Sequence, residues 1–235
     1  FHIDKEHSLI DPSLVSIKNF SSTLANLLYE LGQNQYQDFL EVLITMRQSG
    51  VADSRVDDLI RIGYFEDFGD MKYLINYHEI FSEFYSNKKL KTQFKKEKAL
   101  ELHIDFDLIR SHCKSEAPKT FMGIDSPAII RELVMGYKEK TSFKEMIEAR
   151  TEVLGYIDII DKKYAGYCVC TDLNVEYSPK VKLYALANGS TIPVKVSKKI
   201  FKVDTQYKKT KKKKVNGEWI ENDEKEWWIT EYKVY

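Results

Sequence analysis

The lysines of this chain are unevenly distributed, and their distribution predicts a surface that attracts polyanions. Residues 156–214 hold 14 lysines against 5 acidic residues, although basic and acidic side chains balance over the whole chain of 235 residues. Six of these lysines lie between 208 and 214, around Thr210. Lysines that neutralise phosphates release counterions, so such a surface is typical of nucleic-acid binding.

The lysine run also has a purely structural interpretation. It is followed by Asn216-Gly217, a two-residue turn signal, and residues 215–235 carry 2 lysines against 6 acidic residues. A hairpin with a basic arm and an acidic return arm would neutralise its own charge, whereas a run of like charges can stay disordered. Exposed ion pairs contribute only about 0 to 1 kcal/mol each, so pairing alone does not decide between these alternatives.

Side chains suited to metal or nucleophilic chemistry do not form a pattern. His103, His112 and Cys113 lack a second matching pair, and Cys168 and Cys170 have the spacing of one strand face. The chain has no GxxxxGKS phosphate loop, no GxGxxG and no nucleophile elbow. We therefore expect no catalytic residue, no metal site and no cofactor.

Composition and the first residues favour a folded cytoplasmic protein. Hydrophobic residues make up 43% of the chain, which is ample for packed cores. No apolar run reaches the roughly 18 residues of a membrane span, and charges occur where a signal peptide is apolar. Three cysteines are an odd, sparse set that fits a reducing compartment. Because the chain begins at Phe1 without a methionine, we expect a piece of a longer protein.

The first two thirds of the chain predict helices. Apolar residues recur at helical spacing between 11 and 85, with helix starts at Asp11-Pro12, Ser21-Ser22 and Asp53-Ser54. The periodicity continues to residue 152, and within it the lysine-rich stretch 88–98 is interpreted as a solvated helix face.

The last third predicts β structure. After Gly155, β-branched and aromatic runs are bounded by turn residues, and Asn188-Gly189 predicts a two-residue type I′ hairpin, as Asn216-Gly217 does. We expect strands at 167–169, 182–186, 191–196 and 227–232. About five short strands predict a small barrel or a sandwich. The whole chain is thus expected to be α+β, with helical parts at 1–80 and 81–152 and a β domain at 153–235.

One segment has a close resemblance to a known family. Residues 59–69, Leu-Ile-Arg-Ile-Gly-Tyr-Phe-Glu-Asp-Phe-Gly, resemble the end of the tandem helix-hairpin-helix domain of bacterial DNA polymerase III alpha subunits. Residues 14–21 resemble the first hairpin of that domain, and residues 152–156 resemble its join to a β domain with an OB-like fold. The resemblance is strong over 10–74, looser over 152–203 and nearly absent between them.

The resemblance implies a non-catalytic part of a DNA replication protein. In this family the palm, thumb and fingers precede the helix-hairpin-helix domain, so the chain itself is expected to be inactive and its parent to be a DNA-directed DNA polymerase, a nucleotidyltransferase. The implied partners are double- and single-stranded DNA, a sliding clamp and other replisome subunits, with no membrane.

The family's DNA contacts can be carried over to particular residues. A helix-hairpin-helix unit holds a phosphate on backbone N–H groups at a helix N-terminus. In an OB fold, bases stack on aromatic side chains while lysines follow the nucleic-acid backbone. The candidate residues are Lys18, Asn19 and Ser21 in the first hairpin, Ser54 and Arg55 in the second, Lys180, Lys182 and Tyr184 on the β face, and Lys211, Lys212, Lys213 and Lys214 in the basic arm.

An alternative function is a protein-interaction scaffold within a replisome, without direct DNA contact. The zero net charge favours it, and so do Asn19 and Ser21, which occupy positions where the family has glycines. The aromatic residues Tyr64, Phe65 and Phe68 are assigned to packing, because aromatic side chains at a helix end usually fill the core.

Overall fold

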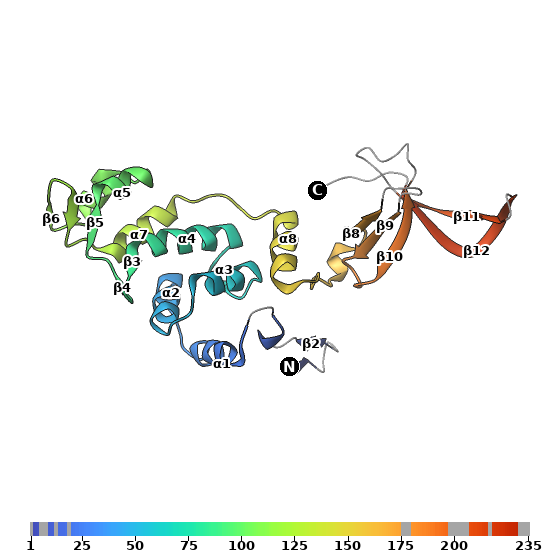
Figure 1. Cartoon of the computed structure of the whole chain (residues 1–235), viewed down its shortest axis with the longest axis horizontal. Coiled ribbons are helices and arrows are strands. Elements are labelled where there is room, and N and C mark those ends of the chain that lie inside the picture. The colour runs from blue at the N-terminus through green and yellow to red at the C-terminus, as the bar shows by residue number, and fades with distance from the viewer. Residues whose placement is uncertain are drawn as a thin grey trace. The chain divides into compact units, whose positions relative to one another are not determined.

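The chain forms two compact units, residues 1–157 and 158–235, in this computed structural model (Figure 1). The structure describes residues 2–4, 9–11, 14–17, 20–174, 180–196, 207–215 and 218–229. The first unit is mainly helical and the second is built on a β-sheet, so the predicted α+β class, with a mainly helical part before a β part, is confirmed.

Eight α-helices of six to fourteen residues make up most of the described part of the first unit. They are α1 (Ser22–Leu31), α2 (Phe39–Gln48), α3 (Asp53–Arg61), α4 (Met71–Phe84), α5 (Lys96–Glu101), α6 (Phe106–Ser111), α7 (Ser126–Met135) and α8 (Phe143–Leu154). The short helices η1 (Leu14–Ser16) and η2 (Glu66–Phe68) and the strand pair β1 (His2–Asp4) and β2 (Leu9–Asp11) complete its first half. The helix start predicted at Ser21-Ser22 is confirmed, because the Ser21 hydroxyl accepts a hydrogen bond from the Leu24 N–H at 3.1 Å.

One hydrophobic core serves the whole of this unit. Its members run along the chain from Ile17 to Val153. The rings of Phe84, at the end of α4, and Phe94 stack with centroids 4.4 Å apart. Helix α4 also runs without a break across the expected boundary between residues 80 and 81. The two expected helical parts therefore pack as one unit, because apolar residues from both sides of that boundary enter the same core.

The segment 81–152, predicted to be a helical connector, contains helices α5 to α8 but also short strands that were not predicted. A hairpin of β3 (Tyr85–Ser86) and β4 (Lys89–Leu90) follows α4 directly. A three-stranded antiparallel sheet then forms from β5 (Gln93–Lys95), β6 (Ser115–Glu116) and β7 (Thr120–Met122), with β7 in the middle.

A turn explains why the helical pattern stops there. Asn87 and Lys88 both have positive φ angles, of 51° and 61°, which is the geometry of a two-residue hairpin turn. The lysines of 88–98, interpreted as one solvated helix face, are instead divided among the β3–β4 turn, β4, the loop after it, β5 and the start of α5. Strands of two or three residues are too short to produce an alternating pattern that sequence analysis can recognise.

The second unit is built on a five-stranded sheet with the order β11-β12-β10-β9-β8. The strands are β8 (Cys168–Asn174), β9 (Lys180–Ala185), β10 (Thr191–Val196), β11 (Tyr207–Val215) and β12 (Glu218–Ile229), and the short helix η3 (Lys162–Tyr164) precedes them. All neighbours are antiparallel except β10 and β12, which are parallel. Among the described strands, β8 and β11 are unpaired edges, so the sheet is open, and the expected barrel is not formed by them.

The two predicted hairpins have different outcomes. Strands β9 and β10 are joined as expected, but β9 ends at Ala185 and β10 begins at Thr191, so the turn is longer than two residues. Gly189 has a φ of 68°, whereas Asn188 is not among the described residues with positive φ, so a type I′ turn was the wrong prediction. Strands β11 and β12 pair antiparallel on either side of 216–217, as predicted, while Asn216 and Gly217 themselves lie outside the described residues.

Helix α8 is fastened to α4 by hydrogen bonds and an ion pair. Asp70, the N-cap of α4, accepts hydrogen bonds from the Lys72 N–H at 3.0 Å and the Thr141 hydroxyl at 2.6 Å. Lys72 Nζ lies 2.8 Å from Glu145 Oε1, and Glu145 also accepts the Ser142 N–H in the capping box of α8. These bonds to the charged carboxylate lower the pKa of Glu145 to about 2, with the Lys72 ammonium as the main cause.

We predict that Glu145→Gln weakens the pH dependence of stability in acid. The folded-state pKa of Glu145 is depressed from its ordinary 4.5, so its contribution is present above that value and is lost as the pH falls toward 2. Urea unfolding, followed by helical circular dichroism between pH 6 and pH 2.5, should show a shallower loss of stability in the variant. The matched control is Glu148→Gln, whose basic neighbour Lys144 lies 3.7 Å away. Equal acid slopes for the Glu145→Gln variant and the unmodified chain would contradict the assignment.

Candidate nucleic-acid interface

Strand β9 places the three predicted β-face residues on one side of the sheet. Side chains alternate along a strand, so Lys180, Lys182 and Tyr184 share a face, while Val181 and Leu183 share the other. Both lysines are exposed, whereas Val181 is buried. The apolar face packs in a small core with Val194 and Ile192. The alternation of side chains along β9 therefore separates a basic face from an apolar one.

One row of in-register positions crosses all five strands of the sheet. Starting at β8, the backbone pairs Asn174 with Lys180, Lys180 with Lys195, Lys195 with Trp228 and Trp228 with Lys208. Three of the five positions in this row are lysines and one is a tryptophan. Within the row the structure describes the side chains of Lys180, which is exposed, and Lys195, which is half-buried. We name these five positions the cross-strand row.

The neighbouring row has the opposite character. In it Leu173 pairs with Val181, Val181 with Val194, Val194 with Trp227 and Trp227 with Lys209, so four of its five positions are apolar and the fifth is a lysine. Residues directly opposite each other on paired strands lie on the same face. The tryptophan pair of β12 thus occupies one basic row and one apolar row, which agrees with the alternation expected for adjacent residues on a strand.

Lys182 forms an ion pair with an aspartate of the neighbouring strand. Its Nζ is 3.3 Å from Oδ2 of Asp172, the residue paired with it on β8. A β-bulge between Cys170 and Asp172 shifts the register of β8 at this point. Because both side chains are exposed, this ion pair is weak and Lys182 keeps most of its attraction for an anion.

Tyr184 is held against the β9–β10 turn. A side chain at Gly189 would come within 3.2 Å of the Tyr184 hydroxyl and within 2.9 Å of Ile160, so glycine is needed there for space as well as for its positive φ. Burial raises the pKa of Tyr184, and the charge of Asp158 raises it further. Tyr184 is therefore a neutral, half-buried phenol at pH 7, closer to a packing residue than to an open stacking platform.

The basic arm forms β11. The backbone places Lys212 opposite Glu221, but Lys213 and Lys214 lie opposite Ile220 and Trp219. Lys211 lies at a register shift between Thr210 and Lys212, so no residue of β12 lies directly opposite it in the described pairing. Of Lys211 to Lys214, only Lys212 lies opposite an acidic residue. The prediction that the two arms of the hairpin neutralise each other therefore holds within this run at Lys212.

The turn between α2 and α3, predicted as the second hairpin, contains a glycine with positive φ, and the nearby Arg55 is paired within the unit. Helices α2 and α3 are joined by a turn with Gly50 at φ 88°, and α3 begins after Ala52, which makes no side-chain cap. Ser54 is exposed in the first turn of α3. Arg55 Nη1 lies 2.6 Å from Asp58 Oδ2, and its guanidinium is 5.8 Å from the centroid of the Phe20 ring.

Of the three residues predicted in the first hairpin, Ser21 lies among the described residues. Lys18 and Asn19 lie outside the described residues, while Ser21 is the N-cap of α1. Of the aromatic residues assigned to packing, Phe65 is buried and its ring centroid lies 5.3 Å from that of Phe39, and Phe68 also packs on the core. Tyr64 is 41% exposed, but its ring packs edge-on against Phe65 with centroids 5.1 Å apart, so it packs at the margin of the core.

A buried histidine that sequence analysis missed organises the second hairpin. His78 on α4 is 3% exposed, and its Nδ1 lies 2.7 Å from Asp57 Oδ1 while its Nε2 lies 3.3 Å from Asp53 Oδ1. Arg47 reaches the same Asp53 at 3.1 Å and donates a hydrogen bond to the Val51 carbonyl at 3.0 Å. Asp53, which could oppose a phosphate, is therefore held by two basic groups of the unit. The signal in the sequence was a histidine within the apolar stripe of α4.

We predict that His78→Gln lowers the free energy of unfolding by about 1–3 kcal/mol, because it removes a buried ring whose two nitrogens lie within hydrogen-bonding distance of Asp57 and Asp53. Urea unfolding at pH 7 measures the change. The control is His112→Gln, which removes the partly exposed contact of 2.8 Å to Glu132 and should cost less than about 1 kcal/mol. Equal costs at the two histidines would mean that the cluster around His78 does not stabilise the hairpin.

Comparison with known proteins adds no family to these observations. No protein-family model, no curated protein and no solved structure matches the chain. In the part of the chain that the structure describes, no three His, Cys, Asp or Glu side chains converge as a metal site would require. None of the described helices is long and apolar enough to span a membrane.

Proposed function

We propose that this chain is a non-catalytic DNA-binding portion of a DNA polymerase III alpha-like subunit. Its sheet holds single-stranded DNA along the cross-strand row, and the turn between α2 and α3 touches duplex backbone as a helix-hairpin-helix unit does. The cross-strand row carries the DNA-binding part of this proposal, because it lines up three lysines with a tryptophan across the whole sheet. The polymerase parent, the OB-like ancestry of the sheet, and the clamp and replisome partners in the cytoplasm depend on the resemblance of residues 10–74 and 152–203.

The geometry of the row suits a single strand. Neighbouring strands of a sheet are 4.7–4.9 Å apart, so five of them give a track of about 19 Å. Proteins that bind single strands combine a positive groove along the backbone with aromatic side chains on which bases stack. A strand lying along the row would meet Lys180 and Lys195 next to each other, then the position of Trp228, then that of Lys208.

Charge also favours the second unit as the DNA-binding one. Residues 158–235 hold 16 lysines against 11 acidic residues, while residues 1–157 hold 20 basic against 25 acidic residues. The electrostatic part of nucleic-acid affinity follows the phosphates that are neutralised. The acidic first unit is repelled by DNA except where backbone N–H groups at a helix N-terminus offset that repulsion.

The contribution of the α2–α3 turn is accordingly small in this proposal. The first N–H groups of α3, at Asp53 and Ser54, have no acceptor within the helix and are available to a phosphate. Arg55 is paired with Asp58 and adds little positive charge. Asp53 is held by Arg47 and His78, which reduces its repulsion of an anion.

A scaffold without DNA contact is the second candidate function. The engaged Arg55 and the acidic surplus of residues 1–157 favour it. In that case the lysines of the sheet would meet acidic side chains of a protein partner. Affinity for nucleic acid would then be weak and would depend little on the number of lysines in the row.

We predict that replacing Lys180 and Lys195 together by glutamine weakens binding to a labelled oligothymidylate at low salt. Each neutralised phosphate contributes about 0.7 to the slope of log K against log salt for a single strand, so the slope should fall by about 1.4. Fluorescence anisotropy from 50 to 300 mM salt, with a hairpin duplex measured in parallel, provides the data.

The matched control for this prediction changes two exposed lysines of the first unit, Lys119 and Lys140, to glutamine. It removes the same charge and should leave the slope unchanged. An equal fall in both variants would indicate a general charge effect, and no fall in either would favour the scaffold.

A further inference from the structure

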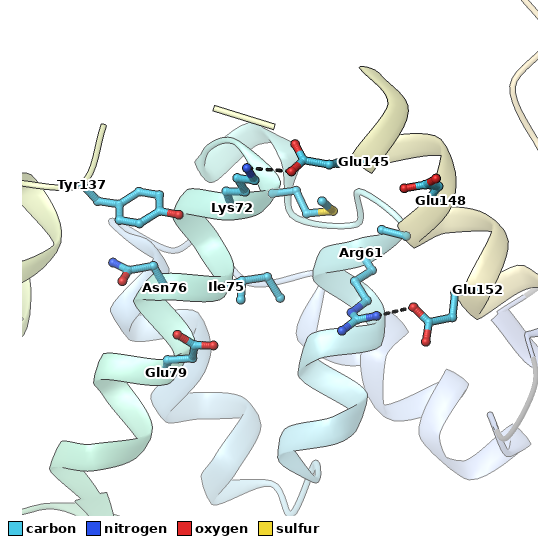
Figure 2. A pocket seen from close by; sticks show the side chains of 11 residues that line it. Arg61, Lys72, Ile75, Asn76, Glu79, Tyr137, Glu145, Glu148 and Glu152 are labelled. Atoms are coloured by element: carbon cyan, nitrogen blue, oxygen red, sulfur yellow. Dashed lines mark hydrogen bonds and ion pairs between the residues drawn. The ribbon is translucent and has the colours of Figure 1, made fainter. Parts of the chain in front are cut away.

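Helix α8 presents a polar face to the rest of the first unit. A hollow of about 470 Å³ lies between α4 and α8 and extends to Arg61 of α3 (Figure 2). From α8 it is lined by Glu145, Glu148, Ala149 and Glu152. The spacing of these four residues is that of one helix face, which is normally apolar when a helix packs against a core. Because three of the four are glutamates, close apolar packing does not attach α8 along this face.

Helix α8 also contributes little to the buried core of the unit. Of its twelve residues, Val153 is a member of that core, and Leu154 packs against it. Ile147, in the middle of the helix, is buried but is not a member of the core. Core packing therefore anchors α8 at its C-terminal end.

Two ion pairs join α8 to its neighbours. Lys72 Nζ of α4 lies 2.8 Å from Glu145 Oε1, and Arg61 Nη1 of α3 lies 2.6 Å from Glu152 Oε2 (Figure 2). The side chain of Glu145 is 41% exposed and that of Glu152 is 72% exposed, so ions in solution screen both pairs. Exposed pairs of this kind are weak, and their strength depends on the salt concentration.

The two ends of α8 differ in how they are attached. Before the helix, Thr141 donates its hydroxyl hydrogen bond to Asp70, the N-cap of α4, at 2.6 Å. After the helix, Gly155 has a φ of 80°, and the first unit ends two residues later. The contact at Thr141 lies outside α8, so it can persist when the helix itself is released.

We propose that α8 is a salt-sensitive strap: residues 143–154 leave α3 and α4 as one segment while the rest of the first unit stays folded. Segments of a native protein open in this way when they bury few apolar contacts. Because α8 is the last helix of the first unit, its release lengthens the connection from Thr141 to the second unit. The proposal concerns the first unit and does not depend on DNA binding by the sheet.

The test is native-state hydrogen exchange of the full ¹⁵N-labelled chain, followed by NMR at 20 and 300 mM sodium chloride. An isolated helix of twelve residues is marginally stable in water, so the amides of a released α8 exchange. We expect the amides of Ile147 and Arg150 to exchange at least about tenfold faster than those of Tyr77 and Phe81 in α4. The higher salt concentration should accelerate exchange in α8 about fivefold and leave exchange in α4 nearly unchanged.

Variants separate the release of α8 from a general effect of charge. Glu145→Gln with Glu152→Gln removes both ion pairs, and glutamine can still cap the helix. At 20 mM salt this variant should exchange its α8 amides about fivefold faster than the unmodified chain, and added salt should have little further effect. The control, Glu79→Gln with Glu148→Gln, removes the same charge from the lining of the hollow, and Glu148 pairs with Lys144 of α8 itself. Exchange in α8 should not accelerate in the control.

Exchange of α8 and α4 at the same rate would show that α8 opens only when the whole unit unfolds, and this would overturn the proposal. Exchange in α8 that does not respond to salt, or equal acceleration in both pairs of variants, would overturn it as well.

Discussion

The hydrogen-bonded register between β9 and β10 is the constraint on which the account of the sheet depends. It places Lys180 opposite Lys195 and Val181 opposite Val194, so one row is basic and the next is apolar. Side chains alternate with a period of two, and a slip of one residue would exchange the faces. Val181 and Val194 are buried, and a slip would expose them to water. Exposing each valine would cost about 1.5–3 kcal/mol of hydrophobic stabilisation, so their burial opposes the slip. The core on one face thereby fixes the lysines on the other.

The first unit uses its charges in a different way. Its basic residues are largely occupied within the fold, as Arg47 with Asp53, Arg55 with Asp58 and Arg61 with Glu152 illustrate. Two of these pairs join helices, α2 to α3 and α3 to α8, whereas the pair of Arg55 lies within α3. The two units therefore differ in charge: residues 1–157 have an acidic surplus, and residues 158–235 have a surplus of lysines.

Sequence patterns predicted the elements whose signals are long or local. Ser21 before a helical stripe identified the cap of α1, and the β-branched run at 191–196 coincides with β10. The patterns failed where tertiary contacts decide. The turn at Asn87-Lys88 lacks the glycine that would have signalled a hairpin in the sequence. The strands of the first unit are too short for an alternation of polar and apolar residues to be recognised. His78 contacts Asp57 only when α3 and α4 pack together, so the contact depends on tertiary structure. The cross-strand row joins residues from 174 to 228 through strand pairings that no local sequence pattern encodes.

Photocrosslinking tests the central claim most directly. An oligothymidylate carrying 5-iododeoxyuridine at successive positions would be irradiated with the full chain, and the crosslinked peptides would be identified by mass spectrometry. The account predicts crosslinks in β12 at Trp228 and in peptides of β9 and β10, at low salt and with competition by unlabelled single strand. Crosslinks confined to exposed tyrosines of the first unit, such as Tyr29 or Tyr64, would contradict it.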